Sequence, residues 1–388
     1  MGARSAAGVV VVLVAVLALW LVLRSGWSPL DNGDGANCFT LHLYAADAIN
    51  ESLLVETRLC QRPAVFLVDT GYAGPPVLSA SYLVTGDAGR RDDSFGARYA
   101  ATVRRLEEGR GASEIEQHRA VARFLREQTA CKAFTSGCTM RLMSIGATQE
   151  QQADMMLCPL LEMKMPDGAY RAPRGGGVAA EVFVTNPLPT SVHILTCDYL
   201  VHISPVLLDV RRGRLCAHLD AVHAMAHRLK AVMYPMELSG GAFLVPVRLG
   251  GEPFRLTVDT GAPGPISLGA SAAARLTACR ARQTAIAQEG VNGEEICSEV
   301  VLARLEFAHR EFEDVPVFVN DREVGDVDGY MGMGVLRAFN ILITSSDGIG
   351  FAANGLPLRS AEDYAPAFNA SRCGGADAKG LHTCRAAA

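Results

Sequence analysis

The sequence lacks an excess of basic residues, and it has no long run of lysine or arginine. Lysine and arginine together number 36 against 41 aspartates and glutamates, so the net charge is −5. A nucleic-acid-binding domain usually carries a basic patch or stripe, and we therefore expect no nucleic acid partner. Only 20% of the side chains are charged and 49% are apolar, which excludes a disordered or fibrous chain and allows two domains with sizeable cores.

A metalloprotease helix is also missing. His223 and His227 stand four positions apart and would share one helical face, with His218 or Asp220 as a third zinc ligand. Such a helix needs a general-base glutamate between its two histidines, and the sequence has none there. We predict that residues 218–236 form a linker helix between the two halves of the chain, which are described as lobes below. We expect neither a metal nor another cofactor, and zinc binding by this helix is the alternative.

No charge interrupts Ala6–Leu23, an apolar run of eighteen residues. As a helix it would span about 27 Å, which is close to the thickness of a bilayer's hydrocarbon core. No cleavage site of the small-x-small type follows cleanly. We predict an uncleaved signal anchor, a transmembrane helix over 1–24, followed by a stalk over 25–37. A cleaved signal peptide is the alternative.

Cysteines and glycosylation motifs indicate the secretory pathway. Eleven cysteines suit an oxidising compartment, and Asn50-Glu51-Ser52 and Asn369-Ala370-Ser371 match the N-glycosylation acceptor. We predict a single-pass membrane glycoprotein whose bulk is lumenal or extracellular. The cysteine pairs close in sequence, which are candidate disulfides, are Cys131/Cys138, Cys279/Cys297 and Cys373/Cys384.

The strongest feature of the chain is an internal repeat. Leu53–Ser81 aligns with Phe243–Ser271 without a gap, at fourteen identities in twenty-nine positions. Both copies contain Asp-Thr-Gly, at 69–71 and 259–261, after an apolar strand-like segment. A supersecondary unit that occurs twice predicts two homologous lobes related by approximate two-fold symmetry. Each lobe would then bring one aspartate to the shared interface.

Two Asp-Thr-Gly triplets in one chain resemble the aspartic peptidases, in the two-lobed arrangement of pepsins. The residues that follow each triplet, Tyr72-Ala73-Gly74 and Ala262-Pro263-Gly264, are more similar to those of retropepsins. The resemblance implies a mainly β, bilobal acid-protease fold, in which two β-barrel-like lobes enclose a central cleft. The corresponding boundaries are 38–217 for lobe one, with a helical insertion near 90–130, then 237–360 for lobe two and 361–388 for a C-terminal tail.

The resemblance also assigns roles to residues. Asp69 and Asp259 would form a dyad that shares one proton and activates a water molecule. The residues expected to support this dyad are Thr70, Gly71, Thr260, Gly261 and Gly332. The candidates for the substrate cleft, which include the turns of two possible flap hairpins, are Tyr72, Ala262, Gly146, Asn292 and Gly293.

We therefore predict a membrane-anchored, monomeric aspartic endopeptidase with pseudo-two-fold symmetry, acting on protein or peptide substrates at acidic to mildly acidic pH. Two residues of lobe one depart from the family pattern. Thr196 stands where the matching segment of lobe two has Gly332, and Tyr72 is bulky beside Asp69. They favour the alternative of an inactive protease-like membrane glycoprotein with a structural or binding role. A proenzyme whose segment 25–56 blocks the cleft is a further alternative.

Overall fold

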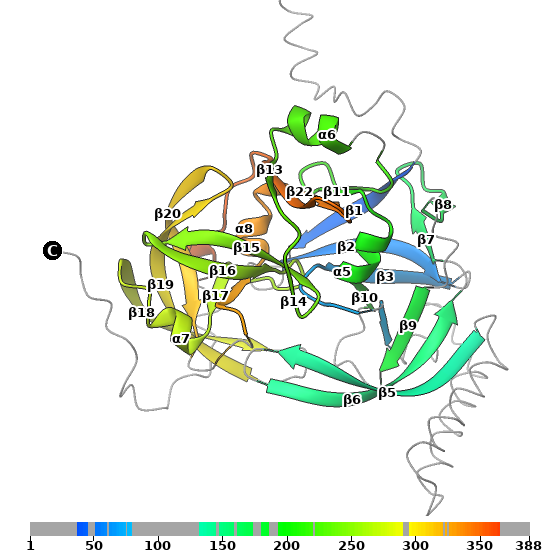
Figure 1. Ribbon diagram of the computed structural model, residues 1–388, viewed down its shortest axis with the longest axis horizontal. Helices are drawn as coiled ribbons and strands as arrows, with labels where there is room; N and C mark the ends of the chain where they lie inside the picture. Colours follow the sequence, from blue (N-terminus) through cyan, green and yellow to red (C-terminus); the bar gives the residue numbers. More distant parts are fainter. Residues whose placement is uncertain are drawn as a thin grey trace, which may run out of the picture.

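The computed structural model describes residues 37–45, 51–59, 62–74, 76–79, 132–144, 147–158, 161–173, 180–185, 193–219, 222–289, 295–320, 323 and 326–364. This part of the chain is mainly β with short helices (Figure 1), as the sequence predicts. Within these ranges, no helix has the length and apolar character needed to cross a membrane. The predicted anchor, the stalk except for Asn37, the helical insertion and both glycosylation asparagines lie outside the described residues.

Lobe one is a sheet in the order β1-β2-β3-β10-β4-β9-β6-β5, and β7 pairs with both β2 and β8. The helix α5 (Cys197–His202) follows β10 directly. The strands are β1 (Cys38–Ala45), β2 (Glu51–Leu59), β3 (Arg62–Asp69), β4 (Val77–Ser79), β5 (Lys132–Ser144), β6 (Ala147–Cys158), β7 (Leu161–Lys164), β8 (Tyr170–Arg171), β9 (Ala180–Thr185) and β10 (His193–Thr196).

Lobe two is a sheet in the order β14-β15-β16-β21-β17-β20-β19-β18, and an additional β15–β19 pairing closes it on itself. Its short helices are α7 (Ala270–Ala273) and α8 (Met333–Leu336). The strands are β14 (Leu238–Ser239), β15 (Ala242–Leu249), β16 (Glu252–Val258), β17 (Ile266–Leu268), β18 (Cys279–Glu289), β19 (Glu295–Phe307), β20 (Arg310–Val319) and β21 (Gly329–Met331).

The sequence repeat is also a repeat of strand register. Leu54 faces Leu67 in the β2–β3 hairpin, and Leu244 faces Thr257 in the β15–β16 hairpin. In each lobe the second hairpin strand then pairs in parallel with a later strand, β3 with β10 and β16 with β21. Because both registers agree with the gapless sequence alignment, the two copies fold in the same way.

A third set of strands joins the lobes, in the order β13-β23-β22-β11-β12-β1. Its central pair is antiparallel, with Leu207 of β11 opposite Leu342 of β22, so the pseudo-two-fold axis passes through this pair. In Figure 1 these strands lie between the strands of lobe two on the left and those of lobe one on the right. The remaining bounds are β11 (Val206–Asp209), β12 (Arg214–Cys216), α6 (Val222–Leu229), β13 (Val232–Tyr234), β22 (Phe339–Thr344), β23 (Gly348–Ala353) and a 3-10 helix (Glu362–Tyr364).

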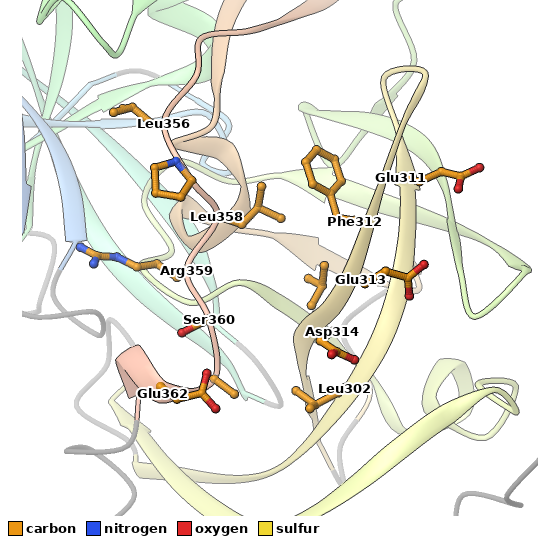
Figure 2. Close-up of a pocket in the computed structure, with 13 residues that line it drawn as sticks. Leu302, Glu311, Phe312, Glu313, Asp314, Leu356, Leu358, Arg359, Ser360 and Glu362 are labelled. Carbon is orange, nitrogen blue, oxygen red and sulfur yellow. The ribbon is translucent and has the colours of Figure 1, made fainter.

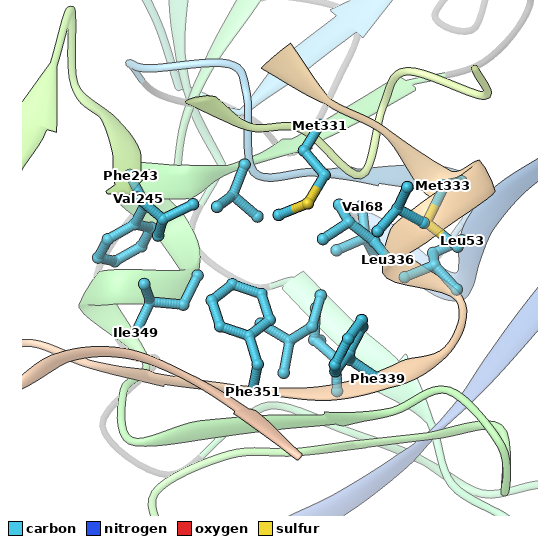
Figure 3. Packing of buried hydrophobic residues seen from close by; sticks show 14 of the residues in the cluster. Leu53, Val68, Phe243, Val245, Met331, Met333, Leu336, Phe339, Ile349 and Phe351 are labelled. Carbon is cyan, nitrogen blue, oxygen red and sulfur yellow. The ribbon is translucent and has the colours of Figure 1, made fainter. Parts of the chain in front are cut away.

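One hydrophobic core extends across both lobes. Figure 3 shows Leu53 and Val68 of lobe one beside Met333 and Leu336 of α8, with Phe339 and Phe351 of the joining strands below them, and all of these side chains are almost fully buried. Burying this apolar surface supplies the main driving force for folding. The lobes are therefore packed on each other through a shared core.

The structure contains a disulfide that the sequence analysis did not predict. Cys38 of β1 and Cys216 of β12 are bonded across 178 positions of sequence. Cys279 is also disulfide-bonded, but the side chain of Cys297 lies outside what the structure describes, so the predicted Cys279/Cys297 pairing stays a prediction. The same holds for Cys131/Cys138 and Cys373/Cys384, which also fall outside the described side chains.

The helix α6 lies inside the predicted linker segment 218–236. His223 is exposed on this helix, with its Nε2 atom 3.7 Å from Asp347 Oδ2. Asp220, one of the two possible third ligands, lies outside the described residues. Among the side chains that are described, no three histidine, cysteine, aspartate or glutamate residues gather in a way that could hold a metal ion.

Candidate active site

Each aspartate stands where a buried strand ends. Asp69 is the last residue of β3 and lies opposite Thr196 of β10, and Asp259 directly follows β16 and donates its N–H to Met331 O at 3.0 Å. The preceding residues, Val68 and Val258, are fully buried. Because side chains alternate along a strand, burial of these valines fixes the register that delivers each aspartate to the loop.

Backbone N–H groups orient both carboxyl groups in the same way. In each lobe, one carboxyl oxygen accepts hydrogen bonds from the second and third residues after it. Asp69 Oδ1 accepts from Gly71 N at 2.9 Å and Tyr72 N at 3.1 Å, and Asp259 Oδ1 accepts from Gly261 N and Ala262 N, both at 2.9 Å. The other oxygen of each carboxyl group is left for the partner aspartate or a ligand.

Two threonines connect the loops across the lobe interface. Thr70 N donates to Thr260 Oγ1, and Thr260 N donates to Thr70 Oγ1, both at 3.1 Å. Each hydroxyl in turn donates to a carbonyl of the opposite lobe, Thr70 Oγ1 to Val258 O at 2.8 Å and Thr260 Oγ1 to Val68 O at 2.6 Å. Both threonines are fully buried, so these four bonds fix the separation of the loops that carry the aspartates.

The glycines of the two triplets allow the aspartates to approach. A Cβ atom at Gly71 would overlap the Cγ atom of Asp259, and one at Gly261 would overlap the Cγ atom of Asp69. Each carboxyl group therefore packs against the backbone of the opposite loop, in space that any other residue type would occupy.

The two carboxyl groups titrate as a pair. Each carboxyl group lies against the backbone of the opposite loop, so the two groups are close enough for the charge of one to act on the other. Burial raises the pKa of Asp69, and the charge of Asp259 raises it further, while burial also raises the pKa of Asp259. Two carboxyl groups this close cannot both ionise easily, so the pair holds one proton at pH values where isolated carboxyl groups would be ionised.

Comparison with known proteins gives one family match. Residues 245–335, which include Asp259 and Gly332, match the family model described as aspartyl protease. This region belongs to the aspartyl protease family. The match does not extend over lobe one. Lobe one is linked to this region by the sequence repeat and by the identical strand register of the two copies.

Among solved structures, the chain is similar to EIAV protease complexed with the inhibitor HBY-793, at 20% identity, over 27% of this chain and 92% of that one, with a TM-score of 0.23. It is also similar to a retropepsin-like aspartic protease from Rickettsia conorii, at 21% identity, over 32% of this chain and 93% of that one, with a TM-score of 0.25. No curated protein matches the chain.

Gly332 supports the aspartate of the aspartyl protease region from behind. It is the N-cap of α8, and a Cβ atom there would overlap the carbonyl oxygens of Ala262 and Gly264. Gly332 N donates to Pro265 O at 2.7 Å, and Met333 N donates to Ala262 O at 2.7 Å. The loop after Asp259 therefore rests directly on the start of α8, as a residue without a side chain permits.

Thr196 takes the same place in lobe one, and the loop adjusts to its side chain. It is the N-cap of α5 and is fully buried. Its hydroxyl donates to Gly74 O at 2.5 Å and accepts from Tyr199 N at 3.4 Å, while Cys197 N still donates to Tyr72 O at 2.9 Å. The departure from the family pattern thus replaces a close backbone contact with a side-chain hydrogen bond.

Tyr72, the second departure, does not displace the carboxyl group beside it. Its N–H donates to Asp69, and its ring packs against Val77 and Ile194. Burial, together with the charge of Asp69, raises the pKa of the Tyr72 phenol, so the phenol stays neutral.

A tyrosine also lies near the second aspartate, but it comes from a different element. Ile194 faces Val77 in lobe one, and the matching pair in lobe two is Tyr330 and Ser267. Burial raises the pKa of Tyr330, and the charge of Asp259 adds to this effect. The repeat alone does not identify Tyr330 as a site residue, because the matching position in lobe one is the aliphatic Ile194.

The predicted flap turns are not described. Gly146, Asn292 and Gly293 fall outside the described residues, although the strand pairs that flank them, β5–β6 and β18–β19, form in both lobes. A separate groove of about 530 Å³ lies between β20 and the segment 356–362. Figure 2 shows that it is lined by Phe312 and Leu358 with acidic side chains around them, and it contains neither aspartate of the pair.

Proposed function

We propose that this chain is an aspartic endopeptidase in which Asp69 and Asp259 act together on the peptide bond. The observation that carries the proposal is the pair of carboxyl groups, each packed against the opposite loop and held by matching loops. Peptide hydrolysis requires a base that takes a proton from water and an acid that polarises the carbonyl group. Two carboxyl groups that share one proton supply both.

The proposed reaction proceeds without a covalent intermediate. The ionised carboxylate takes one proton from a water molecule, whose oxygen attacks the carbonyl carbon, while the neutral carboxyl group gives its proton to the carbonyl oxygen. The tetrahedral diol then collapses: a hydroxyl proton returns to one aspartate, the other transfers a proton to the amide nitrogen, and the C–N bond breaks. The N–H groups of Gly71 and Gly261 hold the carboxyl groups in place during both steps.

The proposal includes an acidic pH optimum. The pair is active only while it holds one proton, and the second ionisation removes the acid. Since burial raises the pKa of both groups, the singly protonated state extends from acidic into mildly acidic conditions. Activity is expected to fall as the pH rises through the second ionisation.

The proposed setting of the enzyme rests on the sequence. An anchor over 1–24 would attach a monomer to the membrane, with the bulk of the chain lumenal or extracellular and a protein or peptide substrate between the lobes. The apolar run Ala6–Leu23 and the eleven cysteines support this part of the proposal. Protease protection of the full chain in microsomes would test it, since a cytosolic bulk would be digested.

The decisive experiment is cleavage of a mixed peptide library by the purified full chain between pH 3 and pH 7, compared with Asp69→Asn and Asp259→Asn. We expect each substitution to abolish cleavage, because each removes one member of the pair. Asp209→Asn is the matched control, since Asp209 is a buried aspartate at the end of β11, paired with Arg212 and part of neither Asp-Thr-Gly loop. Folded wild-type protein without cleavage at any pH would favour the non-catalytic alternative.

A further inference from the structure

A buried carboxylate of lobe one lies between two arginines of lobe two. Glu51, the first residue of β2, has no exposed surface. Arg337 Nη1 lies 2.9 Å from Glu51 Oε1 and donates a hydrogen bond to Glu51 Oε2 at 3.3 Å, and Arg359 Nε donates to the same Oε2 atom at 3.0 Å. Arg337 follows α8, and Arg359 comes from the segment after β23, where Figure 2 shows its guanidinium group pointing away from the groove. Charged hydrogen bonds therefore link the two lobes at this point.

This charged cluster is better suited to fixing the relative position of the two lobes than to stabilising the fold. Removing a carboxylate and two guanidinium groups from water is costly, and well-packed apolar side chains often stabilise a protein as well as a buried ion pair does. Charged hydrogen bonds are, however, strongly directional. A cluster of one carboxylate and two arginines therefore fixes the relative position of the elements that carry them.

Those elements are the supports of the two aspartates. The first turn of α8 holds the loop after Asp259, since Met333 N donates to Ala262 O and Gly334 N donates to Gly264 O at 3.0 Å. Arg337 is the C-cap of the same helix. On the other side, Glu51 is the first residue of β2, and residues 54–59 of β2 pair with β3, the strand that ends at Asp69. The cluster thus joins both supports by a route separate from the threonine bonds.

The equivalent point on the opposite side of the axis has no charge. The position in lobe two that matches Glu51 in the repeat is Gly241, which lies against Ala73 in the loop after Asp69, so closely that a Cβ atom would overlap it. The loop of Asp69 is therefore held by direct contact with lobe two. The loop of Asp259 is held through α8 and the charged cluster.

We propose that Glu51 is a positioning residue that, through Arg337 and Arg359, keeps α8 and the Asp259 loop aligned with Asp69. This inference rests on the proposed peptidase function. It assigns Glu51 no contact with substrate. Its effect is to hold the separation and orientation of the two carboxyl groups, on which the rate of the chemical step depends steeply.

The test compares Glu51→Gln with the matched control Asp209→Asn in the full chain. Both remove a buried negative charge beside arginine, but Asp209 and Arg212 lie three residues apart, at the turn between β11 and β12, and so link no separate elements. We expect Glu51→Gln to lower kcat about tenfold with KM changed less than about twofold, because misalignment affects the transition state more than binding. Asp209→Asn should leave both constants near wild type.

A second variant and a second readout keep the test independent of folding and of activity. Arg359→Lys retains the positive charge at a partly exposed side chain and should lower kcat less than Glu51→Gln does. Hydrogen exchange of the Thr70 and Thr260 amides, which report the loop-to-loop bonds, should be faster in Glu51→Gln than in Asp209→Asn.

The outcomes separate the two proposals. Wild-type kcat and unchanged exchange in Glu51→Gln would overturn the positioning role while the peptidase function stands. Absence of Asp69-dependent cleavage in the wild type would overturn the peptidase function and, with it, a role of Glu51 in that reaction. Amide exchange would then still decide whether Glu51 holds the two loops together.

Discussion

At the aspartates the two lobes are nearly identical, and behind them they differ. Asp69 and Asp259 accept the same pair of backbone N–H bonds, and Thr70 and Thr260 exchange the same bonds across the interface. One layer further back, lobe one has the hydroxyl of Thr196 where lobe two has only the backbone of Gly332. Close symmetry is thus maintained where the lobes touch each other, because each loop there is the other's packing surface.

The outer strands of the joining sheet show the same contrast. Cys38 of β1 is bonded to Cys216 of β12 in lobe one. On the lobe-two side, Tyr234 of β13 faces Ile349 of β23, stacks on Phe307 at 5.7 Å and accepts a hydrogen bond from Ala308 N at 3.0 Å. The two equivalent outer strands, β1 and β13, are therefore fixed by different contacts, one by a covalent bond and the other by an aromatic contact.

The largest effect should come from the positions where the lobes are most alike. Gly71→Ala and Gly261→Ala would each place a Cβ atom on the opposite aspartate, and we expect kcat to fall at least about a hundredfold for either, since a misplacement of about 1 Å is enough. Peptide cleavage assays measure this. Gly168→Ala is the control for backbone strain alone, because Gly168 has a φ of +86° but a Cβ atom there would meet no other atom. A large loss of kcat for only one of the two triplet variants would contradict the equivalence of the two loops.

The second largest effect concerns stability, and it compares the Cys38–Cys216 disulfide with the contact of Tyr234. Replacing Cys38 and Cys216 together by serine should lower the free energy of unfolding by about 4 kcal/mol, because a cross-link over a long loop restricts the unfolded chain most. Tyr234→Phe, which removes only a hydroxyl, should cost about 1 kcal/mol. Urea denaturation gives both values. If the two variants lost similar amounts of unfolding free energy, the hydroxyl of Tyr234 would contribute as much to stability as the disulfide does, which would contradict this prediction.

The N-cap comparison predicts a smaller difference. Gly332→Thr forces a side chain against two carbonyl oxygens and should cost about 3 kcal/mol. Thr196→Gly loses a cap and one hydrogen bond and should cost about 1 kcal/mol. Thermal unfolding measures the stability of both variants. Peptide cleavage that depends on Asp69 and Asp259 is the second readout. If Thr196→Gly lowered the free energy of unfolding more than Gly332→Thr does, the hydroxyl of Thr196 would contribute more to its loop than the close backbone contact at Gly332 contributes to the other.

The sequence predicts the centre of this molecule better than its periphery. The aspartates, threonines and glycines lie within one gapless repeat, so local pattern alone locates them, and the parallel between Thr196 and Gly332 also follows from matched segments. Glu51 and its arginines are 286 and 308 positions apart. Such contacts, like the disulfide across 178 positions, depend on how whole lobes pack. A short sequence pattern therefore cannot predict which distant residues will meet.

The smallest expected effect distinguishes the two aspartates themselves. Asp69 is 9% exposed, while Asp259 is more exposed, so the charged form of Asp69 loses more hydration. Because the folded-state pKa of each group is raised, the pair's contribution to stability is full below the unfolded carboxyl pKa of about 3.9 and is lost as the pH rises through the folded-state pKa. At neutral pH, Asp69→Asn should therefore raise Tm, and by more than Asp259→Asn does. Both differences from wild type should disappear below about pH 4, and a Tm difference that does not change with pH would assign it to packing instead of charge.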